Sequence, residues 1–157
     1  MKCIEMSNFR GIKQRDVYFC TFACIEMCLI YLNERNISQE DIKNSFTPFF
    51  EDNVPMFQTY EDYFTQIFPD FQAVRFNNSE VNELIKYIKH NVNNKYPVIQ
   101  SILSSQGESH AIVILCYDNE KFIYHDPGPN KPSFIRISEY EAFLGGYRGT
   151  LVIKKFN

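Results

Sequence analysis

One cysteine of this sequence lies at the predicted start of a helix, where its thiol could be chemically reactive. Cys20 opens an apolar segment whose residues recur with the i, i+3, i+4, i+7 spacing of a helix: Ile25, Cys28, Leu29 and Leu32. A cysteine in the first turn of a helix faces unpaired N–H groups and the positive end of the helix dipole, which favour the thiolate over the thiol. Because the thiolate is the nucleophilic form, Cys20 is a candidate nucleophile.

Three further residues supply the types of group that acyl-transfer chemistry needs around a thiolate. His110 precedes an apolar run that favours a strand, and Asp126 ends the next such run. Gln14 lies shortly before Cys20 and carries an amide that can donate to a developing oxyanion. A nucleophile, a base, an orienting carboxylate and an oxyanion donor therefore occur in a workable order along the chain.

This pattern resembles the papain-like cysteine peptidases that process bacteriocin leader peptides, here as a free-standing domain. The resemblance covers roughly residues 13–153 and is sharpest in the order and spacing of four positions: Gln14, Cys20, His110 and Asp126. It implies a papain-like α+β fold, with these residues as oxyanion donor, nucleophile, general base and orienting carboxylate. It also implies a peptide or protein substrate, with leader-peptide processing as the candidate reaction.

The residues around Cys20 differ from the usual family motif, which is Asp-Cys-Gly-Pro. Here the motif is Phe19-Cys20-Thr21-Phe22. Three functions therefore stay open: a cysteine peptidase with an acyl-thioester intermediate, an acyltransferase or transglutaminase-like enzyme with the same triad, or a catalytically silent papain-like module that binds a peptide. The intact residue types of the triad favour the peptidase.

Composition and charge narrow the class of protein. The 157 residues are 45% apolar, which suits one domain over residues 1–157 with its own core. The formal net charge of −3 comes without a basic cluster, so nucleic acid is not an expected partner. The first residues contain no apolar run of signal-peptide length, and no segment approaches a membrane span. We expect a cytoplasmic protein.

The same composition bears on cofactors and partners. No segment resembles a nucleotide-binding loop, so any transporter that delivers the peptide is expected to be a separate partner chain. An odd cysteine count of five favours reduced thiols over a disulfide framework. Cys20, Cys24 and Cys28 lie on one helical stripe, but only Cys3 and Cys116 remain to complete a zinc site. We therefore expect no metal and no cofactor.

The elements that must position these residues come in two groups. Helix patterns occupy the first part of the chain: after the Cys20 helix, capping pairs at Ser38 with Asp41 and at Thr59 with Asp62 predict two more, and residues 79–90 predict an amphipathic fourth. The aromatic residues between positions 47 and 76 are expected to pack in the core, while the aperiodic loop 49–55 is expected to border a cleft.

Strand patterns follow, at residues 97–103, 110–117, 121–125, 134–137 and 149–155, with a short helix capped by Ser138 before the last strand. Helices first and an antiparallel sheet second make an α+β plan. His125 competes with His110 as the base because it adjoins Asp126. Neighbours on a strand point to opposite faces, however, so His125 is expected to face away if Asp126 faces the cleft.

Overall fold

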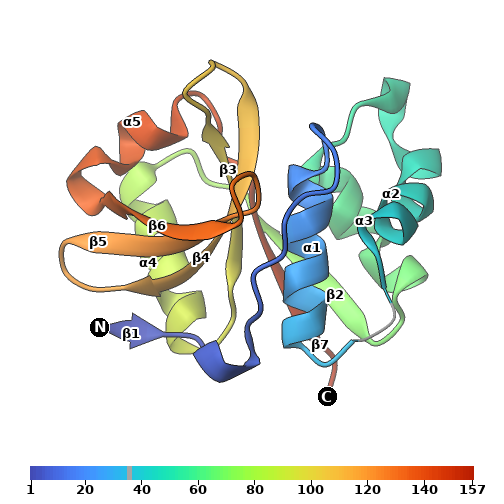
Figure 1. Ribbon diagram of the computed structural model, residues 1–157, viewed down its shortest axis with the longest axis horizontal. Helices are drawn as coiled ribbons and strands as arrows, with labels where there is room; N and C mark the ends of the chain where they lie inside the picture. Colours follow the sequence, from blue (N-terminus) through green and yellow to red (C-terminus); the bar gives the residue numbers. More distant parts are fainter. Residues whose placement is uncertain (35–36) are drawn as a thin grey trace.

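Helix α1 (Cys20–Tyr31) forms the centre of the helical half of the molecule in the computed structural model, which describes residues 1–34 and 37–157 (Figure 1). Every residue of α1 is buried except Cys20, Thr21 and Ile30. The helix is apolar nearly all round, as expected for a helix enclosed by the core. The prediction of a buried helix whose first turn carries Cys20 is confirmed.

Helix α2 (Gln39–Phe46) packs against α1, and helix α3 (Phe57–Ile67) packs against α2 in the same half of the molecule. The predicted capping box of α2 is confirmed, because Ser38 and Asp41 each accept the other's backbone N–H. The predicted cap of α3 is wrong. That helix begins at Phe57, and Asp62 instead accepts a hydrogen bond from the Gln58 side chain within the helix, at 2.7 Å.

The rest of the molecule is built on a seven-stranded sheet. Six of its strands have the order β2-β7-β3-β4-β5-β6, and the seventh, β1, pairs with β4. All of its pairings are antiparallel. The strands are β1 (Lys2–Cys3), β2 (Phe71–Phe76), β3 (Val98–Leu103), β4 (Ser109–Tyr117), β5 (Lys121–Asp126), β6 (Lys131–Arg136) and β7 (Thr150–Lys155). This is the predicted α+β plan, with two strands that the sequence analysis did not predict: β1 near the N-terminus, and β2 between the third and fourth helices.

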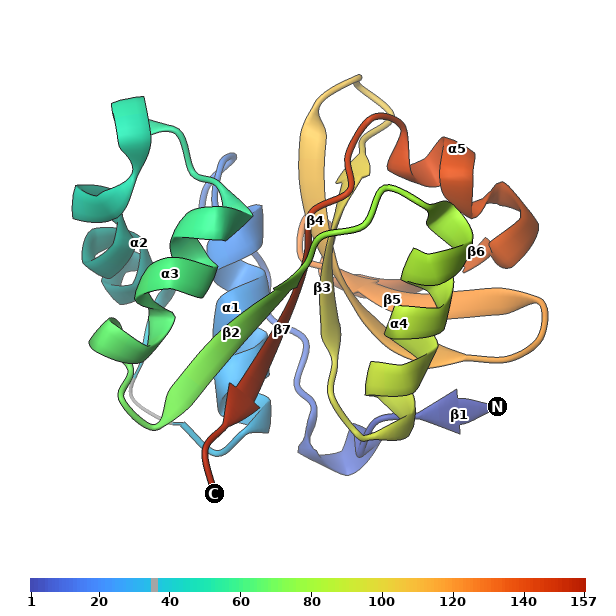
Figure 2. The same cartoon turned by 180° about the vertical axis from the view of Figure 1, so that it is seen from behind.

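Strand β4 is the middle of the core. Its residues 111–116 are buried without interruption, so both faces of the strand are covered. Helix α1 and helix α4 (Val81–Asn93) both contact it, and Figure 2 shows α4 in front of the sheet. The short helix α5 (Tyr140–Leu144) follows a 3-10 turn (Ile137–Glu139), and the predicted Ser138 cap is absent at its start.

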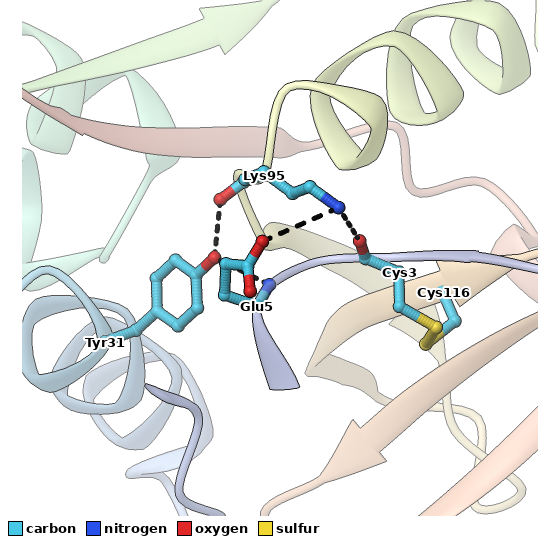
Figure 3. Close-up of a disulfide and its surroundings, with 5 residues drawn as sticks. All are labelled: Cys3, Glu5, Tyr31, Lys95 and Cys116. Carbon is cyan, nitrogen blue, oxygen red and sulfur yellow. Dashed lines mark hydrogen bonds and ion pairs between the residues drawn. A yellow bond between two sulfur atoms is a disulfide. The ribbon is translucent and has the colours of Figure 1, made fainter. Parts of the chain in front are cut away.

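A disulfide joins Cys3 to Cys116, so the expectation of reduced thiols is wrong for these two residues (Figure 3). They are directly opposite each other where β1 pairs with β4. Lys95 also binds this N-terminal segment. Its ammonium group donates a hydrogen bond to the Cys3 carbonyl at 3.0 Å and lies 3.7 Å from the Glu5 carboxylate. Cys20, Cys24 and Cys28 are free thiols, as expected.

The buried apolar residues of both halves form one continuous cluster. Within residues 1–34 and 37–157, no helix has both the length and the apolar character that a bilayer crossing needs.

Candidate active site

The predicted residues come together from four separate segments at one cleft. Cys20 lies in the first turn of α1, His110 near the start of β4, and Asp126 at the end of β5. Gln14 precedes α1, and its backbone N–H donates to the Pro127 carbonyl at 2.9 Å, which ties its loop to the end of β5. All four side chains line the same cleft.

His110 and Asp126 form a close pair. The Nε2 atom of His110 lies 2.7 Å from Oδ1 of Asp126. The backbone N–H of Gly128 donates to the same oxygen at 2.9 Å and so fixes the carboxylate. Burial raises the pKa of Asp126, but the hydrogen bonds from His110 and Gly128 outweigh it, and the pKa lies below its usual value.

The His110 ring is also hydrogen-bonded to Cys20, and each residue shifts the pKa of the other. Burial alone raises the pKa of Cys20, but the hydrogen bond and charge of His110 bring the net pKa below its usual value. Burial lowers the pKa of His110, whereas its hydrogen bonds with Asp126 and Cys20 raise the pKa to about 9. Each ion thus stabilises the other, so the arrangement favours a thiolate beside an imidazolium.

Two groups that the sequence analysis did not assign also lower the pKa of Cys20. They are the backbone N–H of Ala111 and the hydroxyl of Thr21, both hydrogen-bonded to the sulfur. Ala111 follows His110 directly on β4, so one strand supplies both the ring and this backbone donor. The position of Ala111 beside His110 was the only sequence signal for it.

His125 faces away from the cleft, as expected from strand alternation. Its Nε2 atom lies 2.8 Å from Oδ1 of Asn130, and its ring packs edge-on against Phe9. Gly11 passes so close to this ring that a Cβ at position 11 would lie 2.3 Å from Cε1 of His125. Glycine is needed here for the close approach, which makes His125 a packing residue.

Gln14 lies in the cleft, but its amide is turned toward its own loop. Nε2 donates to the carbonyls of Asp16 at 3.0 Å and Val17 at 3.1 Å. Its Oε1 atom is buried and has no hydrogen-bond partner within the part of the chain that the structure describes. The amide must therefore leave these carbonyls before it can donate to an oxyanion.

A buried glutamine holds the loop that carries Gln14. The fully buried amide of Gln39 donates to the Lys13 carbonyl at 2.9 Å and accepts the Arg15 N–H at 2.9 Å. It also donates to Glu26 of α1 at 3.1 Å. Gln39 therefore links the two residues that flank Gln14 to the helix that carries Cys20.

The rest of the cleft suits a polypeptide ligand. Large apolar side chains that are exposed to solvent gather along it: Val17, Tyr18, Val54, Met56 and Leu103. Of the predicted loop 49–55, its last two residues, Val54 and Pro55, contribute to the wall, and residues 49–53 do not line the cleft. No group of three or more histidine, cysteine or acidic residues within 1–34 and 37–157 is placed to hold a metal ion.

The cleft thus holds a thiol, an imidazole and a carboxylate that is paired with that imidazole. The profile of the Peptidase_C39 like family matches residues 6–150. The chain belongs to this family. It is accordingly a cysteine peptidase, a hydrolase, and the resemblance stated from the sequence is confirmed.

Two solved structures share the fold of this C39-like peptidase. One is a double glycine motif protease from an AMS/PCAT transporter in complex with the leader peptide, with a TM-score of 0.68 and 14% identity over 99% of each chain. The other is the peptidase domain of Streptococcus ComA, a bifunctional ABC transporter of a quorum sensing pathway, with a TM-score of 0.63 and 18% identity over 93% of this chain and 96% of that one. No curated protein sequence matches the chain.

Proposed function

We propose that Cys20, His110 and Asp126 are the catalytic triad of this peptidase. The observation that carries the proposal is the position of His110, whose Nε2 lies 2.7 Å from Asp126 and whose ring lines the same cleft as Cys20, close enough to lower the pKa of the thiol. This is the geometry in which a carboxylate orients the imidazole and the imidazole sustains a thiolate. The lowered pKa of Cys20 and raised pKa of His110 support it.

The reaction follows from these positions. The Cys20 sulfur attacks the carbonyl carbon of the scissile bond, and the resulting oxyanion accepts hydrogen bonds from the Cys20 backbone N–H and from the Gln14 amide once that amide has turned away from the carbonyls of Asp16 and Val17. His110 gives its proton to the leaving amine as the C–N bond breaks, which leaves an acyl thioester on Cys20. His110 then takes a proton from water, and the resulting hydroxide releases the acid and regenerates the thiolate.

The altered motif around Cys20 is compatible with this role. Phe19 and Phe22 are both buried and pack edge to face with ring centroids 5.4 Å apart, so neither ring is free to cover the thiol. Thr21 contributes a hydrogen bond to the sulfur, where the family motif has a glycine. The two phenylalanines thus support the start of α1 by packing.

We propose a peptide that carries a leader as the substrate. The exposed apolar side chains along the cleft offer the surface that an apolar peptide segment needs, and the first structural neighbour is a double glycine motif protease in complex with a leader peptide. A separate transporter chain is the proposed partner, because both neighbours come from transporters.

Two measurements test the triad and the reaction. Iodoacetamide labelling from pH 4 to 9, read by mass spectrometry, should modify Cys20 selectively and well below pH 8, and His110→Ala should remove that reactivity. Synthetic peptides with a central Gly-Gly should be cleaved by the wild type and left intact by Cys20→Ala. Reactive Cys20 without cleavage would favour the silent binding module, and transfer to an added amine in place of hydrolysis would favour an acyltransferase.

The cytoplasmic location is a further proposal, and the disulfide provides its test. Disulfides persist mainly in oxidising compartments, whereas cytosolic thiols are kept reduced. Trapping thiols with a heavy maleimide in intact cells would report the state of Cys3 and Cys116. A labelled, reduced pair supports the cytoplasm, and a protected pair contradicts it.

A further inference from the structure

Arg75 is the one lysine or arginine among the cleft-lining residues that the structure describes. It lies on β2 next to Leu151 of β7, on the wall that α3, β2 and β7 form. The two carboxylates in the cleft are those of Glu108 and Asp126, and Asp126 is already paired with His110. Arg75 therefore brings a positive charge to a wall whose other cleft-lining side chains are uncharged.

The guanidinium of Arg75 is only partly paired. One Nη2 hydrogen bond goes to Oε1 of Gln58. The nearest carboxylate is that of Glu61. Its Oε2 accepts a hydrogen bond from the backbone N–H of Arg75 at 2.7 Å, and its Oε1 lies 3.8 Å from Nε of Arg75. The Nε atom is buried and has no hydrogen-bond partner among the described residues. A guanidinium has five N–H donors, so this one retains capacity for another acceptor.

The side chain of Arg75 is partly shielded from water, which strengthens any further hydrogen bond that its guanidinium donates. The side chain is 26% exposed, so its charge is partly removed from water while still open to the cleft. The wall beside it is tightly closed, because a Cβ at Gly149 would lie 3.0 Å from the ring of Phe57 at the start of α3. Charge-assisted hydrogen bonds are stronger where water is partly excluded.

We propose that Arg75 is a specificity residue that binds the carboxylate of a glutamate or aspartate in the peptide substrate. The proposal rests on the peptidase function above and adds a preference for an acidic side chain at one position. The flat, forked guanidinium matches a carboxylate, and Gln58 and Glu61 hold it in place on the cleft wall.

The sheet sets the distance from Arg75 to the scissile bond. Ala111, beside His110 on β4, pairs with Ser101 of β3. Arg75 pairs with Leu151 of β7, which pairs with Ile99, two residues along β3 from Ser101. Arg75 is thus three strand spacings across the sheet and two residues along it from Ala111, or about 16 Å at roughly 4.8 Å per strand and 3.3 Å per residue. An extended peptide covers this distance in about five residues. The acidic residue is expected within about five residues of the cleavage site.

A glutamate scan tests this directly. The probes are internally quenched peptides with a central Gly-Gly, in which a single Glu occupies each of the five positions on either side in turn, each matched by a peptide with Gln there. The wild type should prefer one Glu peptide over its Gln partner by about ten- to a hundred-fold in kcat/KM. Arg75→Gln should lose this preference, and Arg75→Glu should favour Lys at the same position.

Arg136→Gln is the matched control, because Arg136 also lies 3.8 Å from a carboxylate, that of Glu139, but is outside the cleft. This variant should keep the full Glu preference. Thermal unfolding of each variant shows whether it is folded. An unchanged Glu preference in folded Arg75→Gln, or a wild type that cleaves every Glu and Gln pair equally, overturns the proposal.

A binding measurement distinguishes a failure of this proposal from a failure of the proposed peptidase function. Fluorescence anisotropy with Cys20→Ala and the same peptides, labelled with a dye in place of the quencher pair, measures Glu preference without turnover. Preferential binding of a Glu peptide that depends on Arg75, together with a wild type that cleaves none of the peptides, would support the acidic subsite while contradicting the proposed hydrolysis. Cleavage by the wild type without any Glu preference in binding would support the proposed hydrolysis and contradict the acidic subsite.

Discussion

The first turn of α1 and the turns that follow it all carry cysteines, but the pKa of the thiol is lowered in the first turn and raised in the later ones. Cys20 is partly exposed at the cleft, and His110, Ala111 and Thr21 lower its pKa. Cys24, one turn further, is fully buried, and burial raises its pKa well above the usual value. Cys28 is buried too, and its pKa is raised for the same reason. Reactivity thus depends on which turn of the helix reaches the cleft.

The sheet repeats this contrast with histidines. His110 pairs with a carboxylate, and its pKa is raised to about 9. His125 comes from the neighbouring strand, contacts an amide oxygen and a phenylalanine ring, and is 6% exposed. In each case the cleft residue has charged or N–H partners and the core residue has mainly packing partners. Substitutions matched across the two regions should therefore separate loss of chemistry from loss of stability.

The largest separation is expected between Cys20→Ala and Cys24→Ala. The first should lower peptide hydrolysis by about 10⁴-fold or more, because it removes the nucleophile, and should leave stability nearly unchanged. The second should lower the free energy of unfolding by about 1–3 kcal/mol, because it removes a packed side chain, with kcat/KM within about twofold. Urea unfolding and steady-state kinetics measure both. Comparable activity of the two variants would contradict the contrast.

Next comes the pair His110→Ala and His125→Gln. His110→Ala should lower turnover by about 10²- to 10⁴-fold and shift the alkylation of Cys20 to higher pH, because the thiolate loses its imidazolium. His125→Gln should lower stability only. In the wild type, activity should fall as the pH rises through about 9, where His110 loses the proton it gives to the leaving amine.

Stability has a pH dependence of the same origin. The pKa of His110 is raised from 6.5 to about 9 on folding, so its contribution is complete below pH 6.5 and is lost as the pH rises through about 9. The stability advantage of the wild type over His110→Ala should therefore shrink between these two pH values. Urea unfolding at pH 6 and pH 9.5 measures it, and a constant difference would mean that the ion pair does not form.

The order of the elements and the members of the site were accessible to sequence reasoning because they depend on local patterns. Periodicity defined α1 and the strands that carry His110 and Asp126, and β5 differs from its predicted range by one residue. Strand alternation placed His125 on the face away from Asp126. These features need only a few consecutive residues to be recognised.

What escaped prediction depends on distant partners. Strand β2 lies in an aromatic-rich stretch, and its partner β7 follows more than seventy residues later. The disulfide joins positions 113 residues apart. Gln39 looks like an ordinary polar residue at the start of a helix, and only docking against residues 13–15 makes it a buried clamp. No local pattern encodes such pairings, which are set when the chain folds.

Gln39 provides a smaller test of the same contrast, because it is a core residue that acts on the cleft. Gln39→Leu should lower kcat by about tenfold through a displaced Gln14, while the pH profile of Cys20 alkylation stays unchanged. Gln66→Leu, at an exposed site on α3, is the control and should change neither. A fall in stability with kcat intact would make Gln39 a purely structural residue.

The smallest expected effect tests the first turn of α1 itself. Thr21→Val keeps the branched shape but removes the hydroxyl that is hydrogen-bonded to Cys20, so the pKa of the thiol should rise. Thr21 is the smallest of the influences that lower this pKa, so removing its hydroxyl should cost roughly a two- to tenfold loss of thiolate, and alkylation at pH 6 should slow by about that factor. Thr21→Ser retains the hydroxyl and should stay close to the wild type. Equal rates for both variants would mean that His110 and Ala111 alone sustain the thiolate, and that the contrast between Cys20 and Cys24 owes nothing to Thr21.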